Sequence, residues 1–161
     1  MSTLTTWLDT EFGKLAATAL LSMVPVVELR GGIPFGILQG LNPWAAYAAS
    51  VLGNMVPVPL ILVYSRAVFL WARHRFPALG HLLDKLEHRA HLKGRVVLKY
   101  RYWGLFLFVA IPLPGTGGWT GALAAAFLNM RLRNAAPSIL LGLMTAGLLV
   151  LFLTHSVTIL V

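Results

Sequence analysis

Residues 26–36, VVELRGGIPFG, place an acidic residue, a basic residue, a proline and three glycines inside an otherwise apolar stretch. Glu28 and Arg30 are the only charged residues between Lys14 and Arg66. Glycine and proline are the residues that most disfavour a continuous helix, and buried charges are costly unless they are paired. This segment therefore predicts a break in a membrane-embedded helix, with a polar niche at the break.

The chain as a whole is apolar, since 58% of its 161 residues are hydrophobic and 11% are charged, against about 25% charged in soluble domains. So few charges cannot cover a water-facing surface, which predicts an integral membrane protein. Nine of the 13 Lys and Arg residues lie between Arg66 and Arg101. Because apolar segments flank this basic run, we interpret it as a cytoplasmic loop near anionic lipid, not as a nucleic-acid site.

Four apolar segments follow one another, at residues 15–38, 43–70, 103–128 and 135–161. The second and fourth are long enough to span a hydrocarbon core, which takes about 20 helical residues, and Pro57 and Pro59 predict a kink in the second. The first and third carry their helix-breaking residues in the middle, between arms too short to cross. We therefore expect each of these two to form a re-entrant helical hairpin.

A hairpin followed by a span thus occurs twice, and the charges favour opposite orientations for the two units. If both hairpins turn back, the basic run and Arg131 and Arg133 face one side of the membrane, as the positive-inside rule predicts. Weak internal symmetry agrees, because residues 31–32 and 117–118 are both Gly-Gly, and residues 52–53 and 141–142 are both Leu-Gly. Paired, interrupted segments of this kind indicate a transporter binding site.

The predicted fold is therefore an all-α integral membrane protein with an inverted repeat, in one membrane domain of residues 1–161. Residues 1–72 form the first hairpin and span, and residues 103–161 form the second pair. Residues 73–102 form a basic amphipathic helix on the cytoplasmic surface. We expect a multi-pass protein of a bacterial-type inner membrane, and a homodimer, because half-membrane hairpins need protein neighbours.

The two broken centres form the predicted substrate-binding site. Arg30 is a permanent cation whose forked donors suit phosphate or carboxylate, and Glu28 can carry a proton or hold Arg30 in place. Glycine-rich tips expose backbone N–H groups at helix N-termini, where the helix dipole favours an anion. The candidate binding residues are Glu28, Arg30, Gly31, Gly32, Pro34, Asn54, Pro112, Pro114, Gly115, Thr116, Gly117, Gly118 and Thr120.

A structural role is the alternative for each group. Glu28 and Arg30 would then be an ion pair that satisfies an unwound tip, the glycines would only allow turns and close packing, and Asn54 would hydrogen-bond between helices. The histidines of the basic run are interpreted as a solvated polar face. No nucleotide-binding loop, serine-hydrolase elbow or zinc-protease motif is present in the sequence. We therefore expect no enzyme activity, no metal and no cofactor.

Two segments, VELRGGIPFG at 27–36 and IPLPGTGGWTGALAA at 111–125, resemble the small multidrug export family, a branch related to the DedA/VTT-type membrane proteins. The resemblance covers nearly the whole chain in the order hairpin, span, basic linker, hairpin, span. For DedA-type relatives it implies two membrane-embedded hairpins that meet at the midplane and roles in moving lipid phosphates such as undecaprenyl phosphate. Those relatives generally carry acidic and arginine residues at both hairpins, whereas the second tip here has no charge.

Three functions remain open. The favoured one is a small inner-membrane transporter, or flippase, for an anionic lipid phosphate, with Arg30 on the head group and Glu28 available for proton coupling. The first alternative is a proton-coupled exporter of cationic lipophilic drugs, with Glu28 as the counter-charge. The second is a non-transporting assembly factor whose basic loop binds anionic lipids or a partner protein.

Overall fold

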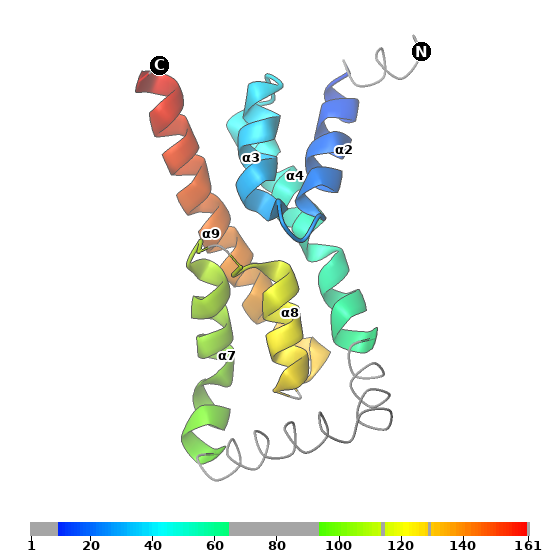
Figure 1. Ribbon diagram of the computed structural model, residues 1–161, viewed down its shortest axis with the longest axis vertical. Helices are drawn as coiled ribbons and strands as arrows, with labels where there is room; N and C mark the ends of the chain where they lie inside the picture. Colours follow the sequence, from blue (N-terminus) through cyan, green and yellow to red (C-terminus); the bar gives the residue numbers. More distant parts are fainter. Residues whose placement is uncertain (1–9, 65–93, 114, 129, 161) are drawn as a thin grey trace.

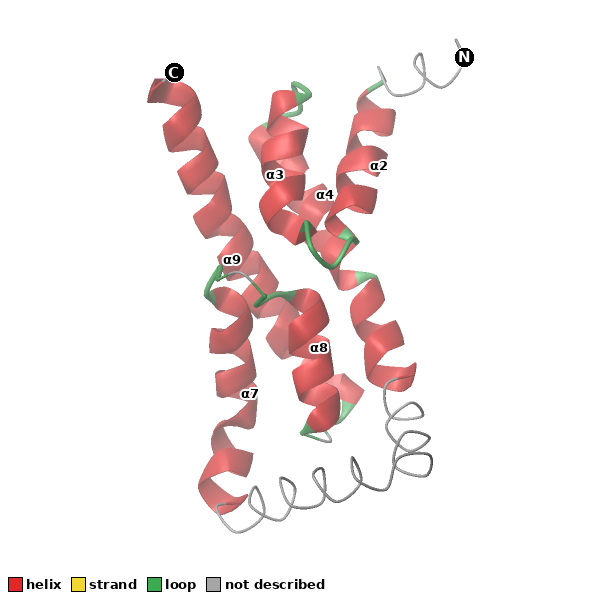
Figure 2. Ribbon diagram, in the orientation of Figure 1, coloured by secondary structure: helices red, strands yellow, loops and turns green. Residues whose placement is uncertain are grey.

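The computed structural model describes residues 10–64, 94–113, 115–128 and 130–160, and this part of the chain is all-helical, without strands. The predicted all-α class is confirmed. Figure 1 shows an elongated bundle, and Figure 2 shows that the described connections between neighbouring helices are short. The helices are α2 (Glu11–Ser22), α3 (Glu28–Leu38), α4 (Pro43–Met55), α7 (Gly94–Ala110), α8 (Gly118–Phe127) and α9 (Leu132–Leu160).

The first helical hairpin consists of α2 and α3, joined by residues 23–27. Thr10 is the N-cap of α2, and its hydroxyl accepts a hydrogen bond from the backbone N–H of Gly13 at 3.1 Å. The connecting turn contains Pro25, which has no backbone N–H with which to continue α2. The chain then reverses, and α3 packs along α2.

The break in the first hairpin is shorter than the sequence predicted. We expected it to extend over the prolines and glycines of residues 25–36, but residues 28–38 form α3, where the N–H of Gly31 donates to the carbonyl of Val27 at 3.1 Å. The glycines here allow close packing instead of a turn. A Cβ on Gly32 would overlap the hydroxyl oxygen of Ser22, so α3 has no room for a side chain at this position. Tertiary packing overrides the low helix propensity of this stretch.

The second hairpin consists of α7 and α8, joined by residues 111–117, and here the predicted break is confirmed. Pro112 lies in the turn, and Gly115 has a φ of 84°, a left-handed conformation that favours glycine. The hydroxyl of Thr116 donates to the carbonyl of Ile111 at 2.6 Å and closes the turn.

The basic linker predicted at residues 73–102 lies mostly outside the described residues. Its last part is described from Gly94 onward, and it belongs to α7, the first arm of the second hairpin. The arm is therefore longer than the predicted one, which began at residue 103.

Each hairpin is followed by a helical stretch that is long and apolar enough to cross a membrane, Pro43–Tyr64 and Leu132–Ser156. Asn42 caps the start of α4 by accepting from the N–H of Trp44 at 2.9 Å. Within the first stretch the helix is interrupted at Val56, directly before Pro57, as the predicted kink requires. Figure 1 shows that α4 and α9 run in opposite directions.

Small residues bring the long helices close to the first arm of each hairpin. A Cβ on Gly53 of α4 would overlap the backbone of Ala19 in α2. In the other half, a Cβ on Gly142 of α9 would lie 2.7 Å from Cβ of Val109 in α7. Close approach through small residues is the packing mode typical of helices in lipid, where apolar side chains gain little by leaving the solvent.

Replacing Gly53 with alanine is expected to lower the thermal midpoint of the detergent-solubilised protein, because the added methyl group pushes α4 away from α2. Overpacking of this kind typically costs about 1–3 kcal/mol. Differential scanning fluorimetry measures the midpoint. The control is Gly104→Ala, since no heavy atom lies within 4 Å of a Cβ at Gly104. Equal midpoints for the two variants would contradict the close α2–α4 contact.

Candidate functional site

The turns of the two hairpins meet and exchange hydrogen bonds. The indole Nε1–H of Trp119, in the first turn of α8, donates to the carbonyl of Met23 at 2.9 Å. Arg30, in the first turn of α3, donates through Nη2 to the carbonyl oxygen of Thr116 and, at 3.0 Å, to its Oγ1. We call this meeting point of residues 23–30, 111–113, 115–119 and Asn54 the hairpin junction.

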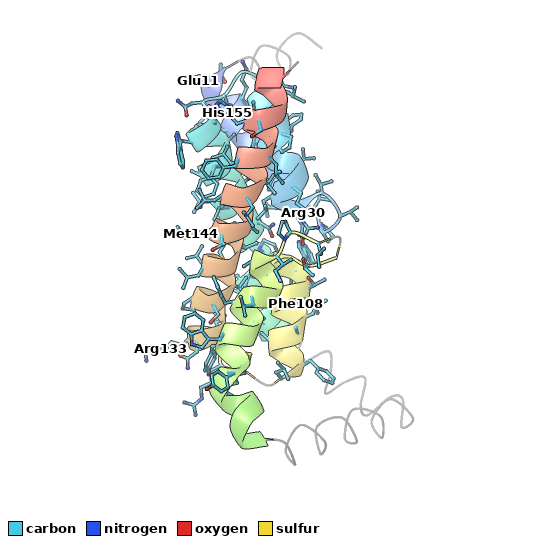
Figure 3. The ribbon with its side chains drawn as sticks, turned by 90° about the vertical axis from the view of Figure 1, so that its left-hand side faces the viewer. Glu11, Arg30, Phe108, Arg133, Met144 and His155 are labelled. Atoms are coloured by element: carbon cyan, nitrogen blue, oxygen red, sulfur yellow. The ribbon has the colours of Figure 1, made fainter. Side chains whose placement is uncertain are left out.

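The hairpin junction lies far from both ends of the bundle. Figure 3 shows Arg30 between the end that carries Glu11 and His155 and the end that carries Arg133. In Figure 1 the turns of both hairpins come together in the middle third of the long axis. The turns of the two hairpins therefore lie together, with the first turn at residues 23–27.

Two helix N-termini face the hairpin junction. From there α3 and α8 run away in opposite directions, so the positive ends of both helix dipoles point toward the same place. At α8 the first intrahelical bond runs from the N–H of Gly121 to the carbonyl of Gly117 at 2.8 Å. The N–H groups of Gly118, Trp119 and Thr120 precede that bond and need other acceptors.

The carboxylate of Glu28 lies at the N-terminus of α8. Its side chain belongs to α3 and is 7% exposed. A Cβ on Gly117 would overlap both carboxylate oxygens, and the backbone N–H of Trp119 lies within hydrogen-bonding reach of them. Acidic groups are favourable at helix N-termini. The Glu28 carboxylate therefore lies against Gly117, at the start of a helix whose N-cap residue has no side chain.

Arg30 uses only part of its donor set within the hairpin junction. Its Nη2 group bonds to Thr116, while Nε and Nη1 have no hydrogen-bond partner among the described residues. Glu28 and Arg30 attract each other electrostatically, but the contacts of both reach across to the second hairpin. Glu28 and Arg30 therefore join the two hairpins. The structural alternative described them only as an ion pair within the first hairpin.

Two fully buried polar side chains come from α4. Asn54 and Ser50 are each 0% exposed, and neither the amide group of Asn54 nor the hydroxyl of Ser50 has a hydrogen-bond partner within the described ranges. A Cβ on Gly118 would overlap Oδ1 of Asn54, so this amide group lies against the first turn of α8. Ser50 faces Gly32. Buried side-chain amides are bonded in most proteins, which makes Asn54 the most unusual polar group of the junction.

The other predicted residues divide into turn-forming and packing residues. Pro112 and Gly115 belong to the second turn, and the hydroxyl of Thr120 accepts from the N–H of Gly117 at 2.9 Å. Gly31 and Gly32 lie inside α3 and contribute no free tip amide, contrary to the sequence expectation, and Pro34 lies inside the same helix. Pro114 lies outside the described residues.

Sequence reasoning missed three residues that the structure places at or beside the hairpin junction, namely Met23, Ser50 and Trp119. The signal for Trp119 was present, because an indole N–H next to Gly-Gly at a helix start needs an acceptor. The carbonyl of Met23 and the hydroxyl of Ser50 carry no such signal. Their roles depend on which helices face each other.

Two apolar helical stretches are of spanning length, each is preceded by a helical hairpin, and together with the family match they support a helical membrane protein. The chain belongs to the family described as "Putative small multi-drug export protein", whose model matches residues 28–149. This confirms the resemblance to the small multidrug export family and supports a transporter in general. No curated protein and no solved structure matches the chain.

Replacing Arg30 with glutamine is expected to destabilise the fold, because the charged hydrogen bonds to Thr116 are lost. Hydrogen bonds to charged groups contribute about 1.5–3 kcal/mol, so the thermal midpoint in detergent should fall clearly. Arg133→Gln is the matched control, since Arg133 is exposed at one end of the bundle. If both variants melt at the wild-type temperature, Arg30 does not hold the hairpins together.

Proposed function

We propose that the chain is an inner-membrane exporter of amphiphilic anions such as lipid phosphates, built as an inverted repeat of re-entrant hairpins and spanning helices. Family membership supports export in general. The observation that carries the anionic substrate is the Arg30 guanidinium, whose Nε and Nη1 groups lack partners among the described residues and which lies beside two helix N-termini. Guanidinium groups and helix N-termini are both suited to phosphate.

The inverted repeat rests on corresponding contacts in the two halves. In each half a hairpin precedes a long apolar helix, and the second unit runs opposite to the first (Figure 1). The Leu-Gly pairs at 52–53 and 141–142 also correspond, because Gly53 packs on the first arm of one hairpin and Gly142 packs on the first arm of the other. Such repeats in transporters place the substrate site at their interface near the bilayer midplane.

Re-entrant hairpins account for the apolar surface at the first turn. Val26 is 91% exposed there. Lipid is a favourable solvent for its side chain. The end of the bundle with Arg133 is the cytoplasmic end in this proposal, as the positive-inside rule requires. A head group would then cross at the hairpin junction while its tail stays in the bilayer, and a second copy of the chain would cover part of the exposed hairpin surface.

Single cysteines test this topology, because the chain has none of its own. In intact spheroplasts, Gln39→Cys should react with a membrane-impermeant maleimide, and Arg133→Cys should react only after permeabilisation. Val26→Cys should stay unreactive in both conditions and react in detergent, because its side chain would face lipid. Reaction of Val26→Cys in intact membranes at the rate of Gln39→Cys would contradict a re-entrant hairpin.

Proteoliposome assays test the substrate. Wild-type protein should accelerate the movement of a fluorescent lipid phosphate between leaflets, and Arg30→Gln should slow this movement by about tenfold or more, which corresponds to about 1.4 kcal/mol of lost binding. Arg133→Gln should keep the wild-type rate. Equal rates for wild type and Arg30→Gln would overturn the anionic substrate.

The second candidate function is export of a cationic drug, and the same proteoliposomes test it. The family description and the buried Glu28 carboxylate favour this candidate. In that case Glu28→Gln abolishes proton flux driven by a lipophilic cation. Movement of the lipid phosphate would then be slow in every sample, including the wild type.

A further inference from the structure

We propose that the Glu28 carboxylate is a resident anion at the N-terminus of α8, and that the substrate anion takes its place there when Glu28 is protonated. This inference rests on the anionic substrate proposed above and concerns how that substrate is coupled to a proton. It starts from the contact of Glu28 with Gly117 and from its proximity to the N–H of Trp119. A 10-residue helix begins at that point without a side-chain cap of its own.

The buried amide group of Asn54 is the independent observation that points to a ligand at this place. It is 0% exposed, unpartnered among the described residues, and in contact with Gly118. The oxygen and nitrogen of such an amide can exchange places by rotation about χ2. With Nδ2 turned toward α8, Asn54 donates to an anion that lies at the helix start.

The donors at the hairpin junction are of the kinds that bind an anionic head group. Arg30 supplies Nε and Nη1, which have no partners in the described part of the chain. Asn54 supplies its amide N–H, and α8 supplies the backbone N–H groups of its first turn. The Glu28 carboxylate already occupies part of this set. Two anions in one buried place repel each other strongly, so the head group and ionised Glu28 compete.

Arg30 is the one charged group that faces Glu28 in the described residues. The helices α4 and α8 contain no charged residue, and α2 carries Glu11 and Lys14 only in its first turn, away from the hairpin junction. In α9, Arg133 and His155 lie toward opposite ends of the bundle (Figure 3). The junction therefore holds one cation and one resident anion.

Exchange of Glu28 for the substrate keeps this charge balance. When the substrate anion enters, Glu28 takes up one proton and becomes a neutral carboxylic acid, so Arg30 again faces a single negative charge. When the anion leaves, Glu28 releases the proton and returns to α8. No bond other than the O–H bond of Glu28 forms or breaks. One proton therefore accompanies each anion.

Titration calorimetry of the full chain in neutral phosphatidylcholine nanodiscs tests the exchange. The probe is hexanesulfonate, which stays singly charged across the pH range, and the control ligand is hexyltrimethylammonium. Measurements in buffers of different ionisation enthalpy count the protons taken up. We expect wild type to bind the sulfonate with uptake of about one proton and with affinity that rises about tenfold for each pH unit lowered while free Glu28 is ionised.

Variants separate the steps of this proposal. Glu28→Gln, with Glu28→Ala run alongside, should bind with no proton uptake and with an affinity independent of pH. Asn54→Leu should weaken binding about tenfold, which corresponds to about 1.4 kcal/mol, and should leave the proton count unchanged. Glu11→Gln, at the far end of α2, should behave as wild type. Thermal midpoints show which of these variants are folded.

The outcomes distinguish this inference from the proposed function. Arg30-dependent binding without proton uptake in the wild type would overturn the exchange and leave the anionic substrate in place. Loss of binding in folded Glu28→Gln or Glu28→Ala would also overturn the exchange, because Glu28 would then be a required ligand. Wild-type binding of hexyltrimethylammonium in place of the sulfonate would overturn both.

Discussion

The polar contacts exchanged between the two hairpin turns are the interaction on which the rest of the structure depends. Each turn leaves backbone groups that its own segment does not satisfy, and each receives partners from the other turn. Arg30 reaches the carbonyl of Thr116, Trp119 reaches the carbonyl of Met23, and Glu28 covers the start of α8. In a lipid environment, unsatisfied backbone groups cost several kcal/mol each. The hairpins therefore stabilise one another, and the long helices pack around the result.

Much of this architecture could be predicted from the sequence, because the strongest local signals agree with the global fold. The order of hairpins and long apolar helices, the turn around Pro112 and Gly115, and the interruption before Pro57 follow from helix-breaking residues in apolar context. The first turn was predicted to be longer than it is, since Gly32 has a role that only its neighbours reveal. It lies where Ser22 and Ser50 approach α3, so its lack of a side chain allows contact between helices.

For the candidate site, too, the sequence predicted which residues are unusual but not which residues they contact. Glu28 and Arg30 stood out as isolated charges in an apolar stretch, and both lie at the hairpin junction. Their separate targets on the second hairpin could not be predicted, because residues two apart can face the same or different partners depending on the backbone. The positive φ of Glu28, 49°, is part of that arrangement. Membership in an export family indicates transport in general. The guanidinium group of Arg30 is suited to bind an anion at the hairpin junction.

The interruption of helical structure at Val56 falls two residues after Asn54, and thus beside the level at which the hairpins meet. The preceding segment, Pro43–Met55, packs on α2 and α3. The described part of α9 passes the same level without a break. The two long helices therefore differ at this level: the first is divided into two helical segments beside the hairpin junction, whereas the described part of the second is one uninterrupted helix.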